Sequence, residues 1–348
     1  MFIIKKIVAI LCVLTFTLPI KSIDLENKTI LWLGTSIPEG CTYPEYVCKT
    51  LGLTCINKAL GASFLCMKPI TPPFYYHTGL SLSTSSEEKG VLCQQYLDKG
   101  ELDDEFLSAW KEASYDKRIG GGILEDADII IIDHGYNDGD ILEEEIKQSY
   151  SDIDWNSKDR TTFIGAFNYL YDIIKRNNPN AIVMIGGYFQ NTCTFSYTKR
   201  GKYVSTICKW IADHYNIPLL DVWNYTNIPD GYIQNSENYL NELNEKYGTN
   251  YKKIFEDQNG NITHFQKFCP DGVHPFTDPT GESDKILNEI FYKLIYHYLS
   301  IYYPSTGIAE FNSKIENIEY NLNGQKVNTY HKGFTIRKNN KRITKYIK

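Results

Sequence analysis

Apolar and polar residues follow two kinds of pattern along this chain. Short continuous apolar runs, of which the β-branched run 128–133 is the clearest, are typical of strands buried on both faces. Longer segments carry apolar residues at helical spacing, as in 161–176, which ends before Asn-Asn-Pro. The predicted strands are 29–33, 54–58, 128–133, 181–185 and 217–222, and the predicted helices are 43–51, 161–176, 203–215 and 283–302.

This alternation of strands and helices predicts the fold class. Strand–helix–strand units favour right-handed crossovers and therefore an α/β fold with a parallel, here five-stranded, sheet covered on both faces. Functional sites of such sheets lie at the carboxyl ends of the strands. Two long connections, 62–124 and 224–268, interrupt the alternation, and we expect them to shape access to a substrate.

The N-terminus carries a targeting pattern. Lys5 and Lys6 precede the apolar run 7–20, which predicts a secretory signal peptide over 1–22. The run is shorter than the roughly 20 residues that span a bilayer, although an uncleaved membrane anchor is the alternative. The hypothesis is an exported protein (periplasmic, cell-surface or secreted) with no stable membrane span once the signal is removed.

The C-terminus differs in composition from the predicted main domain, 23–303. Segment 304–348 is rich in Lys and Arg, and its patterns predict strands at 318–322, 333–337 and 342–346. It resembles the short C-terminal tails of exported Bacteroidetes proteins, some of which are sorting domains. A small basic β appendage is the alternative interpretation.

Composition narrows the classes of function. A hydrophobic fraction of 42% is enough to form a buried core. A net charge of −6, with no sign of a nucleic-acid-binding basic surface, argues against a nucleic-acid partner. Eight of the nine cysteines lie beyond the predicted signal, an even number that permits disulfides in an exported chain and leaves their pairing open. Their spacing does not match a zinc ribbon. They are Cys41, Cys48, Cys55, Cys66, Cys93, Cys193, Cys208 and Cys269.

Polar residues suited to acyl transfer stand next to these predicted elements. Ser36 follows the first strand, and His274 and Asp271 precede the last helix. A serine hydroxyl needs a base to become a nucleophile, His274 can supply one, and Asp271 can fix its tautomer. The backbone N–H groups of Ser36 and Gly61 and the side-chain amide of Asn137, after the second and third strands, would complete an oxyanion hole.

The four sequence blocks around these residues resemble the SGNH (GDSL-like) hydrolase family. They are Gly-Thr-Ser at 34–36, Asn-Lys-Ala-Leu-Gly-Ala-Ser at 57–63, Gly-Tyr-Asn-Asp at 135–138 and Asp-Gly-Val-His at 271–274. The resemblance covers roughly 28–302 and assigns the family's roles to Ser36, Gly61, Asn137 and His274, with Asp271 as the triad acid. It implies a flavodoxin-like α/β/α sandwich and ester hydrolysis without a metal or cofactor. Thr35 departs from the family pattern, which has Asp there.

Other patterns are weaker. Ser36 does not lie in Gly-x-Ser-x-Gly, which argues against an α/β-hydrolase elbow, and Gly120-Gly121-Gly122 lacks the residues of a phosphate loop. The histidines show no metal-ligand spacing, and His134 and Asp221 fit structural roles better.

The sequence therefore predicts an exported serine esterase. The first hypothesis is deacetylation of carbohydrates, so that the partner is a small-molecule or polysaccharide ester substrate. A lipase or short-chain carboxylesterase is the first alternative. A non-catalytic glycan-binding or surface protein on the same fold is the alternative from another class.

Overall fold

A computed structural model describes residues 25–67, 81–190, 195–225, 237–248, 255–256, 262–263, 267–304, 334–339 and 342–347. The predicted signal peptide lies outside the described residues. In the described part of the chain no helix is both long and apolar enough to cross a membrane.

The core of the molecule is a five-stranded sheet in which every pairing is parallel. Its strand order, β2-β1-β3-β4-β5, is the flavodoxin-like doubly wound order. The strands are β1 (Thr29–Gly34), β2 (Thr54–Asn57), β3 (Ile129–Asp133), β4 (Ile182–Gly186) and β5 (Leu219–Leu220). The predicted five-stranded parallel α/β fold is thereby confirmed, although β5 is shorter than the run 217–222 suggested.

Burial explains why the apolar runs form the centre of the sheet. Every residue of Ile129–Ile132 in β3 is fully buried, because helices cover both faces of this strand. The register pairs Gly34 of β1 with Asp133 of β3. The chain segments that follow these two strands therefore leave the sheet side by side.

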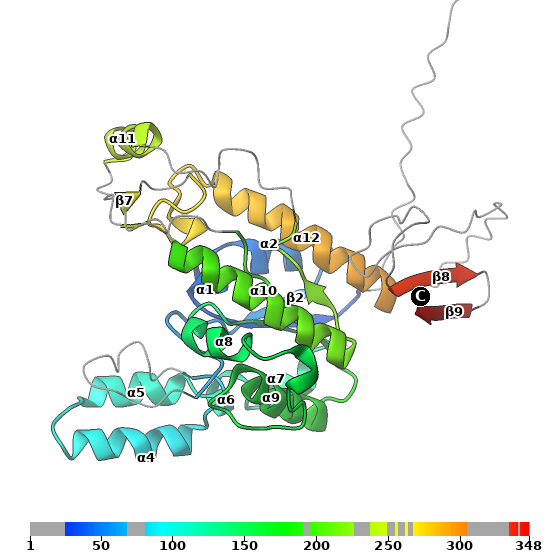
Figure 1. Cartoon of the computed structure of the whole chain (residues 1–348), viewed down its shortest axis with the longest axis horizontal. Coiled ribbons are helices and arrows are strands. Elements are labelled where there is room, and N and C mark those ends of the chain that lie inside the picture. The colour runs from blue at the N-terminus through cyan, green and yellow to red at the C-terminus, as the bar shows by residue number, and fades with distance from the viewer. Residues whose placement is uncertain are drawn as a thin grey trace, which may run out of the picture.

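The helices surround the sheet in two layers. Helices α2 and α12 lie together on one side of the strands, and α7, α8 and α9 on the other (Figure 1). The first layer joins the sheet through Tyr43 of α2, whose ring stacks on Phe291 of α12 at 3.9 Å and contacts Trp32 of β1. The helices are α1 (Ser36–Gly40), α2 (Tyr43–Leu51), α4 (Ser86–Leu97), α5 (Asp104–Glu112), α6 (Tyr115–Arg118), α7 (Ile123–Asp126), α8 (Gly139–Glu145), α9 (Phe163–Asn177), α10 (Phe195–Tyr215), α11 (Glu237–Tyr247) and α12 (Glu282–Tyr302), with short 3-10 turns η1 (Tyr150–Asp152) and η2 (Pro275–Thr277).

The first long connection contains a helical hairpin that the sequence analysis did not predict. Helices α4 and α5 pair outside the main body of the domain (Figure 1) and enclose a small core of Cys93, Phe106 and Trp110. Helix α4 begins with a capping box between Ser85 and Glu88. We call the segment 81–126, which carries α4 to α7, the insertion.

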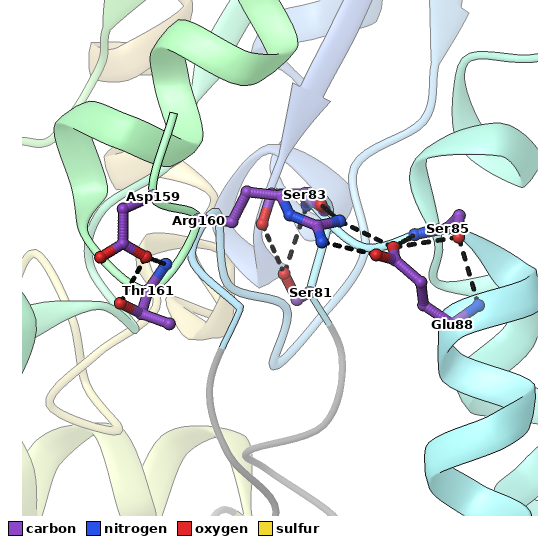
Figure 2. A network of polar contacts seen from close by, with 7 residues as sticks. All are labelled: Ser81, Ser83, Ser85, Glu88, Asp159, Arg160 and Thr161. Carbon is purple, nitrogen blue, oxygen red and sulfur yellow. Dashed lines mark hydrogen bonds and ion pairs between the residues drawn. The ribbon is translucent and has the colours of Figure 1, made fainter. Parts of the chain in front are cut away.

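A polar network joins the insertion to the loop before α9 (Figure 2). The Arg160 guanidinium donates to both carboxylate oxygens of Glu88 and, at 3.1 Å, to the carbonyl of Ser83. The capping Ser85 hydroxyl also donates to Glu88, at 3.0 Å. One carboxylate therefore caps α4 and pairs with an arginine of the main domain.

The remaining described segments are small. The second long connection contributes α11 and two short antiparallel strands, β6 (Phe255–Glu256) and β7 (Ile262–Thr263). In the C-terminal segment, β8 (Phe334–Asn339) and β9 (Arg342–Ile347) form an antiparallel hairpin at two of the predicted strands. The third predicted strand, 318–322, lies outside the described residues, and the role of the tail stays a prediction.

Several cysteines are free thiols in this structure. They are Cys41, Cys48, Cys55, Cys93 and Cys208, and Cys193 lies outside the described residues.

Candidate active site

Ser36 lies in a tight turn at the carboxyl end of β1. A side chain at Gly34 would place its Cβ 2.3 Å from the ring of Pro38 and 2.9 Å from the carbonyl oxygen of Asp133, so only glycine allows the chain to turn here. The turn leads at once into α1, whose first residue is Ser36. The hydroxyl is half-buried at the edge where parallel sheets place their sites.

His274 and Asp271 reach Ser36 from the loop before α12. The Oγ of Ser36 lies 2.9 Å from Nε2 of His274, and Nδ1 of His274 lies 2.6 Å from Oδ2 of Asp271. Because a carboxylate only accepts, Nδ1 carries the proton toward Asp271, and this network leaves Nε2 as the acceptor for the Ser36 hydroxyl. The structure thus brings three predicted residues into one relay across 238 positions of sequence.

The loop itself fixes the Asp271 carboxylate. Its Oδ1 accepts hydrogen bonds from the backbone N–H groups of Val273 at 2.9 Å and His274 at 2.7 Å. Gly272 makes this turn with a φ of +87°, which glycine adopts without strain. Burial by itself would raise the pKa of Asp271, but the hydrogen bonds from the His274 ring and from these backbone groups outweigh it and lower the pKa below its usual value.

The predicted oxyanion donors lie near Ser36, with one difference from the expectation. A Cβ on Gly61 would lie 3.6 Å from the Cβ of Ser36, so the two segments lie in van der Waals reach of each other. However, the Gly61 N–H donates to the carboxylate of Glu39 at 2.7 Å. In the described part of the chain, by contrast, no acceptor pairs with the Ser36 N–H.

Asn137 is held in place by the loop that carries Gly61. Its side-chain amide donates to the carbonyl of Ser63 at 2.9 Å. The next residue, Asp138, is fully buried and accepts from the backbone N–H groups of Leu65 and Cys66. Both residues of this block therefore fix the course of 63–66 beside the site.

Two side chains next to the triad were not considered in the sequence analysis. Glu39, on the exposed side of α1, is the residue that holds the Gly61 N–H. Phe276 is 38% exposed, with its ring 4.8 Å from that of His274 and directly over Gly40, where a Cβ would lie 2.4 Å from a ring carbon. Both positions follow a catalytic candidate by two or three residues, and this proximity in sequence was the available signal.

The remaining candidates lie apart from the relay. His134 is buried, and neither of its ring nitrogens has a hydrogen-bond partner within the described residues. Burial and the charge of Arg118 lower its pKa well below the usual value. Asp221 accepts from the backbone and side chain of Asn224 in the turn after β5. Over the ranges that the structure describes, no cluster of His, Cys, Asp and Glu could hold a metal ion.

Comparisons with known proteins give similarity of structure alone. No family model matches the sequence, and a search of curated proteins returns no match. Among solved structures, the chain is similar to a GDSL-like lipase from Bacteroides thetaiotaomicron, with 15% identity over 80% of this chain and 90% of the lipase and a TM-score of 0.34. It is also similar to a protein from Lactobacillus plantarum, with 13% identity over 79% of this chain and 97% of that protein and a TM-score of 0.39.

Proposed function

We propose that this chain is a serine esterase that works through an acyl-enzyme on Ser36. The observation that carries the proposal is the continuous relay from Ser36 through His274 to Asp271, with separations of 2.9 and 2.6 Å. Hydrogen-bond reach between nucleophile and base, and between base and carboxylate, is the geometric requirement for such chemistry.

The relay supports a two-step reaction. In the first step, Ser36 Oγ attacks the ester carbonyl while its proton passes to Nε2 of His274, and Asp271 stabilises the imidazolium that forms. The tetrahedral intermediate collapses, the alcohol leaves with the proton from His274, and the acyl group stays on Ser36. In the second step, water gives a proton to His274 and attacks the acyl-enzyme, and the acid leaves as Ser36 regains its proton.

The oxyanion of the intermediate would be bound by the N–H groups of Ser36 and Gly61 and by the Asn137 amide. The Ser36 N–H stands ready for this role. Gly61 becomes available only when the exposed Glu39 side chain rotates away, which breaks a single hydrogen bond. Each donor of this kind contributes about 10²–10³ in rate.

The proposed substrate class rests on the exposed Phe276 ring and on the N-terminal pattern. We propose an acetylated carbohydrate, because Phe276 offers an exposed ring beside His274 on which a sugar could stack. Export, suggested by the N-terminal pattern, would bring the protein to extracellular polysaccharides. A lipase or short-chain carboxylesterase is the alternative that the same apolar ring also suits, and a glycan-binding protein without activity is the alternative from another class.

Hydrolysis of p-nitrophenyl esters from acetate to decanoate tests the proposal. We expect the wild-type protein to prefer acetate and Ser36→Ala to lose on the order of 10⁶ in kcat, as in serine hydrolases with such a triad. A preference for long acyl chains would favour the lipase. Wild-type protein that neither hydrolyses any ester above the Ser36→Ala background nor reacts with a fluorophosphonate would exclude a serine esterase and favour a binding function.

A further inference from the structure

Arg118, the last residue of α6, inserts its side chain beneath the site. It is only 4% exposed. Its guanidinium donates from Nη2 to the carbonyl of Gly34 at 2.8 Å, from Nε to the carbonyl of Lys58 at 2.8 Å, and from Nη1 to the hydroxyl of Ser63 at 3.3 Å. A single planar group therefore contacts three separate points of the chain.

These three points belong to the two segments that meet at the nucleophile. Gly34 stands two residues before Ser36, whereas Lys58 and Ser63 lie on either side of Gly61. The carbonyl of Ser63 also accepts the Asn137 amide at 2.9 Å. The Arg118 fork thus links the nucleophile turn to the loop of Gly61 and, through Ser63, to Asn137.

Satisfying these acceptors does not require a charge. The Gly34 carbonyl already accepts from the backbone N–H of Leu60 at 3.0 Å. No carboxylate lies within ion-pair distance of Arg118 in the part of the chain that the structure describes. Burial of an unpaired cation is costly, and such groups concentrate at functional sites.

The Glu39 carboxylate lies close enough to Arg118 for the two charges to interact. One oxygen of Glu39 accepts the hydrogen bond from the Gly61 N–H, which would otherwise bind the oxyanion. This oxygen therefore marks the position of that negative charge. Burial lowers the pKa of Arg118 to about 9, and the negative charge of Glu39 acts in the opposite direction and raises it. A negative charge at the Gly61 N–H therefore interacts favourably with the buried guanidinium.

From this geometry we infer that Arg118 is a positioning residue of the esterase: it holds the Ser36 turn and the Gly61 loop in register and stabilises charge in the oxyanion hole from below. The inference rests on the proposed function. It concerns the tetrahedral intermediate and the transition states that flank it, because the bound ester carries no oxyanion, and so it predicts an effect on kcat rather than on KM.

Arg118→Met and Arg118→Lys test the inference, with Arg160→Met as the matched control. For Arg118→Met we expect kcat on p-nitrophenyl acetate to fall about 10²–10³-fold, comparable to the loss of one oxyanion donor, with KM within about threefold of wild type. Affinity for an alkyl boronate, which forms a tetrahedral adduct on serine, should fall in parallel. Arg160→Met, which removes the guanidinium that pairs with Glu88, should leave both values within about twofold of wild type.

Arg118→Lys keeps the test decisive if the Met variant does not fold. Lysine retains the charge but lacks the rigid fork, so we expect a folded variant with a kcat about tenfold below wild type. A folded Arg118→Lys or Arg118→Met with kcat within twofold of wild type would overturn the inference. So would a lower kcat without a matching loss of boronate affinity.

The same assays separate this inference from the proposed function. An active wild-type enzyme with active Arg118 variants overturns the role of Arg118 alone. A folded wild-type protein without esterase activity overturns the proposed function and, with it, the inference.

Discussion

Two arginines connect the insertion to the rest of the molecule, and they differ in their partners. Arg160 pairs with the Glu88 carboxylate near the surface (Figure 2), and the hydrogen bonds that Arg160 donates to this carboxylate raise the pKa of Arg160 and lower the pKa of Glu88 to about 2. Within the described residues the hydrogen-bond partners of Arg118 are all neutral groups beneath the active site, and burial lowers its pKa to about 9.

The Asp133 carboxyl at the end of β3 resembles Arg118, because it is also buried beside neutral partners. It accepts a hydrogen bond from the Tyr43 hydroxyl at 2.7 Å, and burial raises its pKa to about 7. Within the described residues no cation pairs with it. An ion pair therefore links the insertion to the loop before α9, whereas the catalytic end of the sheet holds desolvated groups whose charges are not cancelled by an ionic partner in the described residues.

The largest effect should come from breaking the relay at the catalytic end. The Asn side chain of Asp271→Asn can donate to Nδ1 of His274 and so favours the tautomer with the proton on Nε2, which cannot accept the Ser36 proton. We therefore expect kcat to fall about 10⁴-fold. Steady-state kinetics measure this loss. As a control, Asp278→Asn alters another carboxylate of the same loop, which bonds Thr280 and Ser283 instead of His274. A kcat of Asp271→Asn within tenfold of wild type would exclude Asp271 from the relay.

Asp133→Asn tests whether the buried, unpaired carboxyl of Asp133 makes the stability of the protein depend on pH. Because the folded-state pKa of Asp133 is raised, its contribution to stability is full below the unfolded value near 4 and is lost as pH rises through about 7. We expect the wild-type free energy of unfolding to decline by about 2–3 kcal/mol from this group between pH 5 and 8. Denaturant unfolding at both pH values measures it.

The control for Asp133 is Glu145, whose pKa burial also raises to about 7. Each of Asp133→Asn and Glu145→Gln should remove part of the decline, and the double variant should remove most of it. If Asp133→Asn leaves the pH dependence unchanged, Asp133 is not a desolvated acid.

Glu39→Ala tests the group that occupies the Gly61 N–H. Because a negative charge must leave before the oxyanion forms, we expect kcat/KM to rise about three- to tenfold, as suits an exposed charge-assisted hydrogen bond. Ester hydrolysis measures it, with the neighbouring exposed carboxylate variant Glu45→Ala as control. A decrease for Glu39→Ala would show that Glu39 orders the Gly61 loop instead of competing with the substrate.

The smallest effect should come from the ion pair of the insertion. Glu88→Gln removes the charge that pairs with Arg160, and because the pair is partly exposed we expect a loss of only about 0.5–1 kcal/mol. Thermal unfolding measures this loss, which should shrink toward pH 2 as wild-type Glu88 becomes protonated. Activity should stay at the wild-type value, and a large loss of kcat would contradict the separation of the two regions.

Local pattern was informative where one segment suffices to make a structure. The apolar runs predicted the central strands β1, β3 and β4 because a strand buried on both faces must be apolar throughout. The hairpin of α4 and α5 was missed because α4 buries little of its own surface, with only Lys89 and Cys93 buried. The Ser-x-x-Glu pattern of Ser85 and Glu88 was the readable sign of its beginning.

The sequence by itself determined the strand pattern and the chemical types at Ser36, Asn137, Asp271 and His274, because these depend on short segments. Only the tertiary structure decided the roles of Glu39 and Arg118. Glu39 meets Gly61 across 22 positions, and Arg118 meets Gly34 across 84. Neither contact can be read from a local segment. The first arises because β1 and β2 pair in the sheet and bring the segments that follow them together. The second arises because the insertion packs against the ends of these strands, where burial gives the guanidinium its unusual environment.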